Sequence, residues 1–151
     1  MMRKLSAGAL LAFSLFAVAC DGGDDSVEAE AYVDGTTQMT ENGAFEVTLF
    51  AEDGDLEAGG NTVILHVAFP EPEGDGAGIP NARVDLTAHM PEQAIEMRST
   101  PLMTYTGGGE YRFDNVMLED DGVWQFDFTI AVGEGIEEDV SFVFDLGADA
   151  E

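Results

Sequence analysis

Large apolar residues recur at every second position along most of this chain, and this spacing constrains the fold more than any other feature. The alternating runs are separated by glycine, proline and acidic residues, and no window between them offers a helical stripe of useful length. Because successive side chains of a β-strand point to opposite faces, each run predicts a strand with one buried face. The seven strands expected on this basis contain Phe45–Leu49, Val63–Phe69, Ala82–Met90, Pro101–Thr106, Tyr111–Phe113, Trp124–Val132 and Val140–Leu146.

Strands of this kind need a second layer to cover their apolar faces. We therefore predict an all-β fold, a seven-stranded antiparallel immunoglobulin-like β-sandwich. Burying the large side chains at about 1.5–3 kcal/mol each gives a gross stabilisation of tens of kcal/mol, so the fold should form without a disulfide or a metal. Trp124 shares a strand face with Phe126 and Phe128, and we expect it between the two sheets.

The N-terminus is a segment of another kind. Arg3 and Lys4 precede an uncharged run, residues 5–19, which is too short to span a bilayer comfortably and suits a secretory signal. Small residues precede a cut site, and the next residue, Cys20, is the only cysteine of the chain. The arrangement resembles the lipobox of bacterial lipoproteins, with Ala17 at the position where that pattern prefers leucine. The resemblance implies cleavage before Cys20 and lipidation of its thiol.

The signal sets the expected location and domain organisation. Residues 1–19 are expected to be a lipoprotein signal peptide, and the mature chain should hang from a membrane through Cys20, on the periplasmic or cell-surface side of the bacterial envelope. An ordinary signal peptidase could cut the same bond and leave a soluble periplasmic protein. Residues 20–42 contain seven acids and no base, which predicts a flexible acidic tether. The remaining residues, 43–151, have the size of one domain.

The charge of the mature chain excludes one class of partner. Without the signal, the chain contains three arginines and 31 acidic residues, which gives a formal charge of −28. Phosphate binding requires a basic face, so nucleic acid is excluded.

Residues suited to catalysis are scarce, and we expect a non-enzyme that requires no cofactor. The mature chain has no lysine, two histidines, no usable thiol and no serine-centred nucleophile motif. The acidic clusters at 53–55, 71–75 and 119–121 lack the spacing of a Ca²⁺ loop and are expected to be solvated. The glycines at 107–109 are followed by no helix that could bind phosphate, so they predict a hairpin turn.

A short pattern between residues 59 and 146 carries a family resemblance. It consists of an N-A-x-V strand at Asn81–Val84, the step Met90–Pro91, a G-x-Y motif at Gly109–Tyr111 and a G-x-W motif at Gly122–Trp124. With these motifs the chain resembles the YtkA-like domain, and FixH-like and CopC-type domains are its looser relatives. The resemblance implies an extracytoplasmic β-sandwich, often lipid- or membrane-anchored, in metal-handling or respiratory-assembly settings and mostly without a defined activity.

Copper is the one metal for which the residues suggest a site. The candidate ligands are His89, Met90, Met97 and Met103, because imidazole and thioether suit Cu(I) in an oxidising compartment. Many YtkA-like relatives carry a segment rich in methionine, histidine and glycine after the Met-Pro step, and here only Met97 remains of it. Alternation directs Met90 to the core and His89 to water, so these two can converge only if Pro91 breaks the strand. Methionine is also a common core residue.

Two functions of different class follow. The first is a non-catalytic interaction or architectural module of the cell envelope, held to the membrane by its lipid, whose loops or sheet edges contact another envelope protein. The second is a periplasmic copper-handling domain with residues 90–103 as its site. His66, alone on a strand face, receives no role in either.

Overall fold

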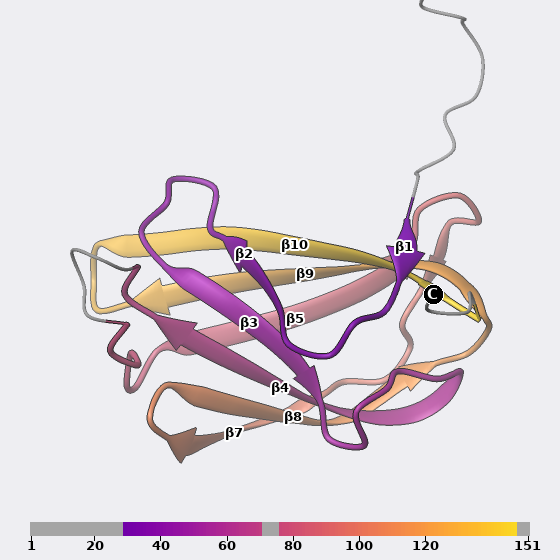
Figure 1. Ribbon diagram of the computed structural model, residues 1–151, viewed down its shortest axis with the longest axis horizontal. Coiled ribbons are helices and arrows are strands. Elements are labelled where there is room, and N and C mark those ends of the chain that lie inside the picture. Colours follow the sequence, from indigo (N-terminus) through magenta and orange to yellow (C-terminus); the bar gives the residue numbers. More distant parts are fainter. Residues whose placement is uncertain (1–28, 71–75, 148–151) are drawn as a thin grey trace, which may run out of the picture.

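Two β-sheets packed face to face form the domain in a computed structural model, which describes residues 29–70 and 76–147 (Figure 1). The strands are β1 (Glu30–Ala31), β2 (Thr36–Met39), β3 (Glu46–Ala51), β4 (Gly59–Ala68), β5 (Arg83–Met90), β6 (Ile95–Glu96), β7 (Leu102–Gly107), β8 (Glu110–Leu118), β9 (Gly122–Val132) and β10 (Ile136–Leu146). The first sheet has the order β1-β10-β9-β5-β6 and the second the order β2-β3-β4-β8-β7. Figure 1 shows the two layers, with β3 and β4 drawn across β5 and β9.

The all-β, two-sheet prediction is confirmed, and the predicted number of strands is corrected from seven to ten. Each of the seven expected runs overlaps one strand, and β1, β2 and β6 are additional. These three contain only two to four residues, too few for an alternating pattern to be visible in the sequence. All pairs are antiparallel except β1 with β10, which is parallel. No helix of the described residues is long and apolar enough to cross a bilayer.

The described part of the predicted tether, residues 29–42, belongs to the folded domain. Tyr32 is only 7% exposed, and its ring meets that of Phe144 edge-on at 5.0 Å. Near the other end of this segment, the backbone N–H of Asn42 donates to the carboxylate of Glu138 at 3.1 Å. The predicted domain boundary at Gly43 is therefore too late. The signal peptide 1–19 and Cys20 lie outside the described residues.

The inner faces of both sheets build one hydrophobic core. Trp124 is fully buried, as predicted, and its indole N–H donates to the carbonyl of Asp120 at 2.8 Å. Rings from the two sheets meet where Phe113 of β8 lies 5.8 Å from Phe128 of β9. The aromatic side chains thus connect the layers as well as filling the space between them.

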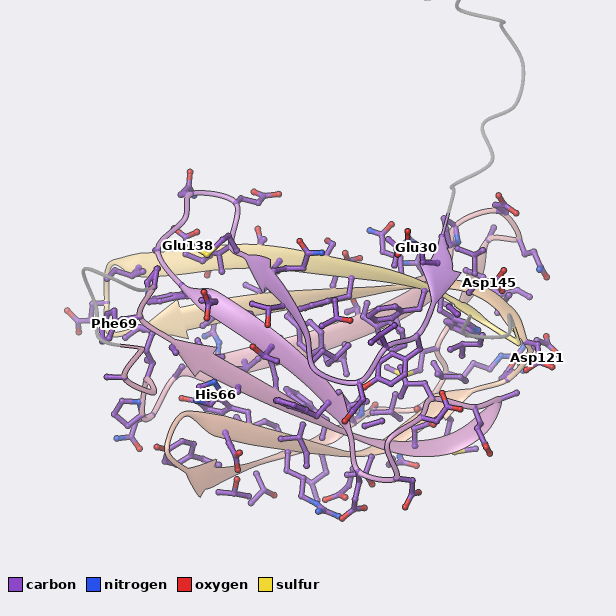
Figure 2. The ribbon with its side chains drawn as sticks, in the orientation of Figure 1. Glu30, His66, Phe69, Asp121, Glu138 and Asp145 are labelled. Atoms are coloured by element: carbon purple, nitrogen blue, oxygen red, sulfur yellow. The ribbon has the colours of Figure 1, made fainter. Side chains whose placement is uncertain are left out.

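Phe69 departs from the predicted pattern. The alternation from Val63 predicts an inward side chain, but β4 ends at Ala68 and Phe69 is 45% exposed at the end of the sandwich (Figure 2). Its backbone N–H donates to the carbonyl of Ala77. Once the strand ends, the two-residue period no longer decides the direction of a side chain.

A buried tyrosine fixes the start of β5. The Tyr111 hydroxyl accepts a hydrogen bond from the backbone N–H of Ala82 at 2.9 Å and donates one to the carbonyl of Ile79 at 2.6 Å. Two backbone groups that would otherwise be unsatisfied in the interior are thereby paired. Because Ala82 directly precedes β5, this contact anchors the strand that carries the candidate site.

Candidate metal site

The candidate ligands His89 and Met90 end β5, where the chain turns back into the short strand β6. The backbone N–H of Gln93 donates to the carbonyl of Met90 at 3.3 Å, and Ala94 adopts a left-handed φ of 53°. A left-handed residue is a common way to complete so tight a turn. The turn returns the chain beside the last two residues of β5.

The pairing of β6 with β5 fixes which side chains share a face. His89 pairs with Glu96, and the next contact is a hydrogen bond from the Met97 N–H to the Ala88 carbonyl at 2.8 Å. Ala88 faces the interior, so Met97, opposite it, also lies toward the interior and packs against the core. Met97 is only partly buried, because β6 is the last strand of its sheet.

The structure keeps His89 and Met90 apart. Met90 is 1% exposed, and a Cβ added at Gly122 would come within 2.8 Å of its terminal methyl. The His89 side chain lies on the outer face of the sheet and is 35% exposed. The strand continues to Met90, so Pro91 does not bring the two side chains together. Met90 is therefore a core residue in this structure.

Met103 lies on β7, the edge strand of the other sheet. It pairs with Phe113, whose side chain is buried, and it packs against the core. Of the four candidate ligands, His89 and Met97 line a common space, but they do so from opposite faces of the sheet and can meet only across the uncovered edge of β5. This space is a groove of about 390 Å³ at the edge of β5. Its wall consists of Leu86, Thr87, Ala88, His89, Glu96, Met97, Ser99, Thr100 and Pro101.

The ligand atoms available in this groove are of the types that Cu(I) prefers. Imidazole nitrogen and thioether sulfur are the ligand types that soft metals accept, and the groove is open to solvent. Within residues 29–70 and 76–147 no three His, Cys, Asp or Glu side chains are grouped to hold a metal ion. A site made of one imidazole and one thioether is of a different kind and would take two ligands from this chain.

An aspartate on the neighbouring strand β9 contacts His89. The Oδ2 atom of Asp127 lies 3.5 Å from Nδ1 of His89, and both side chains are 35% exposed. The Oδ1 atom of Asp127 accepts hydrogen bonds from Gln125 at 2.9 Å and from Ser141 at 2.5 Å. Sequence reasoning missed Asp127 because nothing in the chain marks it among 31 acids; only the register of β5 with β9 brings it beside His89.

Solved structures of copper proteins share this fold. A copper-bound variant of FetP from uropathogenic Escherichia coli strain F11 superposes with a TM-score of 0.52 at 13% identity, over 77% of this chain and 97% of that one. FetP of the same strain, as isolated after expression in the periplasm, gives 0.52 at 14% identity, over 78% and 97%. The copper-reconstituted P19 protein of Campylobacter jejuni gives 0.52 at 12% identity, over 82% and 100%.

The chain has the fold of FetP and P19. At such low identity the likeness concerns the fold alone. No known protein family and no curated protein matches the sequence, so the resemblance to the YtkA-like domain stays a prediction.

The remaining sequence candidates lie away from the groove. His66 lies on β4 in the other sheet (Figure 2), and its Nε2 is 3.1 Å from the carbonyl of Gly108. The acids at 53–55 and 119–121 are exposed, whereas residues 71–75 lie outside the described part of the chain.

Proposed function

We propose that this chain is a lipid-anchored, extracytoplasmic Cu(I)-handling domain of the bacterial envelope, with His89 and Met97 as its ligands. The observation that carries the proposal is the groove at the edge of β5, which both residues line. Binding of one ion by both requires the Met97 thioether to reach His89 round the uncovered edge of β5. The fold shared with copper-bound FetP and copper-reconstituted P19 supports it. Met90 is left out because it is buried in the core, and Met103 because it does not line the groove.

The openness of the groove favours exchange of the metal over permanent storage. This chain offers two soft ligands, and a third can come from solvent or from another envelope protein that delivers or receives the ion. Such a domain needs no catalytic group, so we propose that it acts as a non-enzyme.

The interaction-module hypothesis is also supported by one observation. Among the described residues, β6 covers only His89 and Met90 of β5, which leaves Arg83–Thr87 without a strand partner on that edge. Exposed edges of this kind accept an added strand from another chain. Metal binding separates the two functions, because an architectural module does not require His89 or Met97 to bind Cu(I).

A Cu(I) competition titration tests the proposed ligands. The mature chain carrying Cys20→Ser, which removes the only thiol, should bind one Cu(I). Loss of a ligand should lower the affinity at least as much as loss of a residue that only orients a ligand, which costs about 10–100-fold. We therefore expect His89→Ala and Met97→Leu each to weaken binding about 100-fold. Met97→Leu keeps the side-chain volume and should cost less than about 1.5 kcal/mol in stability.

Matched controls lie on the other sheet. His66→Ala and Met117→Leu remove an imidazole and an exposed thioether that do not line the groove, and both should bind Cu(I) as the parent chain does. Absence of Cu(I) binding in the parent chain, or equal losses in controls and groove variants, would refute the proposed site.

The anchor has its own test. Cys20→Ala should move the protein from the membrane fraction to the soluble fraction of the envelope, because the resemblance to the lipobox assigns the lipid to this thiol. Membrane fractionation with and without a salt wash measures this. A variant that stays in the membrane fraction after the wash would contradict the lipoprotein interpretation.

A further inference from the structure

The orientation of Asp127 is fixed by its neighbours. Its Oδ1 atom accepts two hydrogen bonds, from Gln125 on the same strand and from Ser141 on β10. These contacts hold the plane of the carboxylate and direct its second oxygen, Oδ2, toward Nδ1 of His89 at 3.5 Å. The carboxylate is therefore positioned before any ligand binds.

This contact, an ion-pair distance of 3.5 Å, favours one position of the proton on the His89 ring. A carboxylate can only accept a hydrogen bond, so the neutral imidazole facing it is favoured with its proton on Nδ1. The lone pair then lies on Nε2, the ring nitrogen that does not face Asp127. Metal-binding histidines commonly donate their other N–H to a carboxylate in this way, which fixes both tautomer and ring orientation.

We propose that Asp127 is the positioning residue of the metal site: it holds His89 in the Nδ1–H tautomer and presents Nε2 to Cu(I). This inference rests on the proposed function, since it assigns a role to Asp127 at the same site. A purely structural role predicts something else. An ion pair exposed to this extent is worth about 0–1 kcal/mol and would leave the tautomer and the copper affinity unchanged on removal.

Asp127→Asn is a sharp test because it keeps the shape of the side chain. The amide oxygen can still accept from Gln125 and Ser141, which places the NH₂ group opposite His89. An NH₂ group only donates, so Nδ1 must then accept and the proton must move to Nε2. A wrong tautomer of this origin is known to disable a catalytic histidine in serine proteases. Here it would occupy the proposed ligand atom.

One measurement reports the tautomer of His89, and a second reports the Cu(I) affinity of the chain. Two-bond ¹⁵N–¹H NMR correlations on the metal-free chain at alkaline pH report the tautomer of His89. Competition titration, in the Cys20→Ser background, reports the Cu(I) affinity. We expect the Nδ1–H tautomer in the parent chain, the Nε2–H tautomer in Asp127→Asn, and a loss of about 10–100-fold in Cu(I) affinity in that variant. Asp139→Asn is the control, because Asp139 lies on the same outer face but accepts from Thr129 instead.

The outcomes distinguish this inference from the proposed function. A Nε2–H tautomer in the parent chain, or an Asp127→Asn variant that binds Cu(I) as tightly as Asp139→Asn, would overturn the role of Asp127 while leaving copper binding intact. A parent chain with the Nδ1–H tautomer but no Cu(I) affinity would overturn the proposed function, and with it the assignment of Nε2 as a ligand atom.

Discussion

Replacing Trp124 by alanine is expected to unfold the domain or to leave it barely folded. The indole is fully buried between the sheets, and its N–H is hydrogen-bonded to the carbonyl of Asp120. Truncating a buried tryptophan costs about 3–5 kcal/mol, a large part of the about 5–15 kcal/mol that holds a domain of this size folded. Urea denaturation followed by circular dichroism measures the loss.

Phe69→Ala is the matched control, because this aromatic side chain is 45% exposed and its removal should cost far less. The native emission of Trp124 should also be blue-shifted, as for an indole away from water. If Trp124→Ala kept the parent's unfolding free energy, or if the native emission matched free tryptophan in water, the register of β9 would be wrong.

Gly109→Ala should destabilise the domain by about 2–5 kcal/mol, although it adds a single methyl group. Gly109 has a φ of +83°, and a Cβ there would lie 2.5 Å from the carbonyl oxygen of Val67 and 2.6 Å from the Cα of Gly78. Both neighbours are backbone atoms and cannot rotate away. The contact also secures β4, since the Gly109 carbonyl accepts the N–H of Val67 at 2.9 Å.

Gly108→Ala separates the close approach from backbone strain. Gly108 precedes Gly109 in the same turn and has a φ of +63°, but a Cβ there would meet nothing within 4 Å. Its substitution should cost only the about 1–2 kcal/mol of a left-handed residue. Equal unfolding free energies for the two variants, measured in urea, would show that the packing of Gly109 against Gly78 does not matter.

Periodicity was sufficient to predict the long strands and the core, because burial on one face of a strand forces alternation. Trp124 and the aromatic residues after it are buried as expected. The hairpin at the three glycines is also present, between β7 and β8. The same reasoning failed at Phe69, where the strand ends one residue before the pattern does.

Elements held by few residues could not be predicted in this way. Residues 29–42 contain little apolar alternation, yet the single ring of Tyr32 and a few backbone hydrogen bonds attach them to the domain. Composition describes an average over a segment, whereas the attachment depends on individual contacts.

The candidate site was predictable in its residue types but not in its arrangement. Alternation correctly separated His89 from Met90. Only the structure brings His89 and Met97 to one groove and Asp127 beside His89, since both depend on strand register. Register is set by the whole sheet and is not visible in a short motif.

X-ray absorption spectroscopy of the Cu(I)-loaded Cys20→Ser chain identifies the atoms bound to the metal and so shows whether copper lies at the edge of β5. We expect at least one sulfur scatterer together with the scattering pattern of one imidazole, with the sulfur lost in Met97→Leu and the imidazole lost in His89→Ala. A first shell of nitrogen and oxygen alone, or a shell unchanged by both substitutions, would contradict a copper site at the edge of β5.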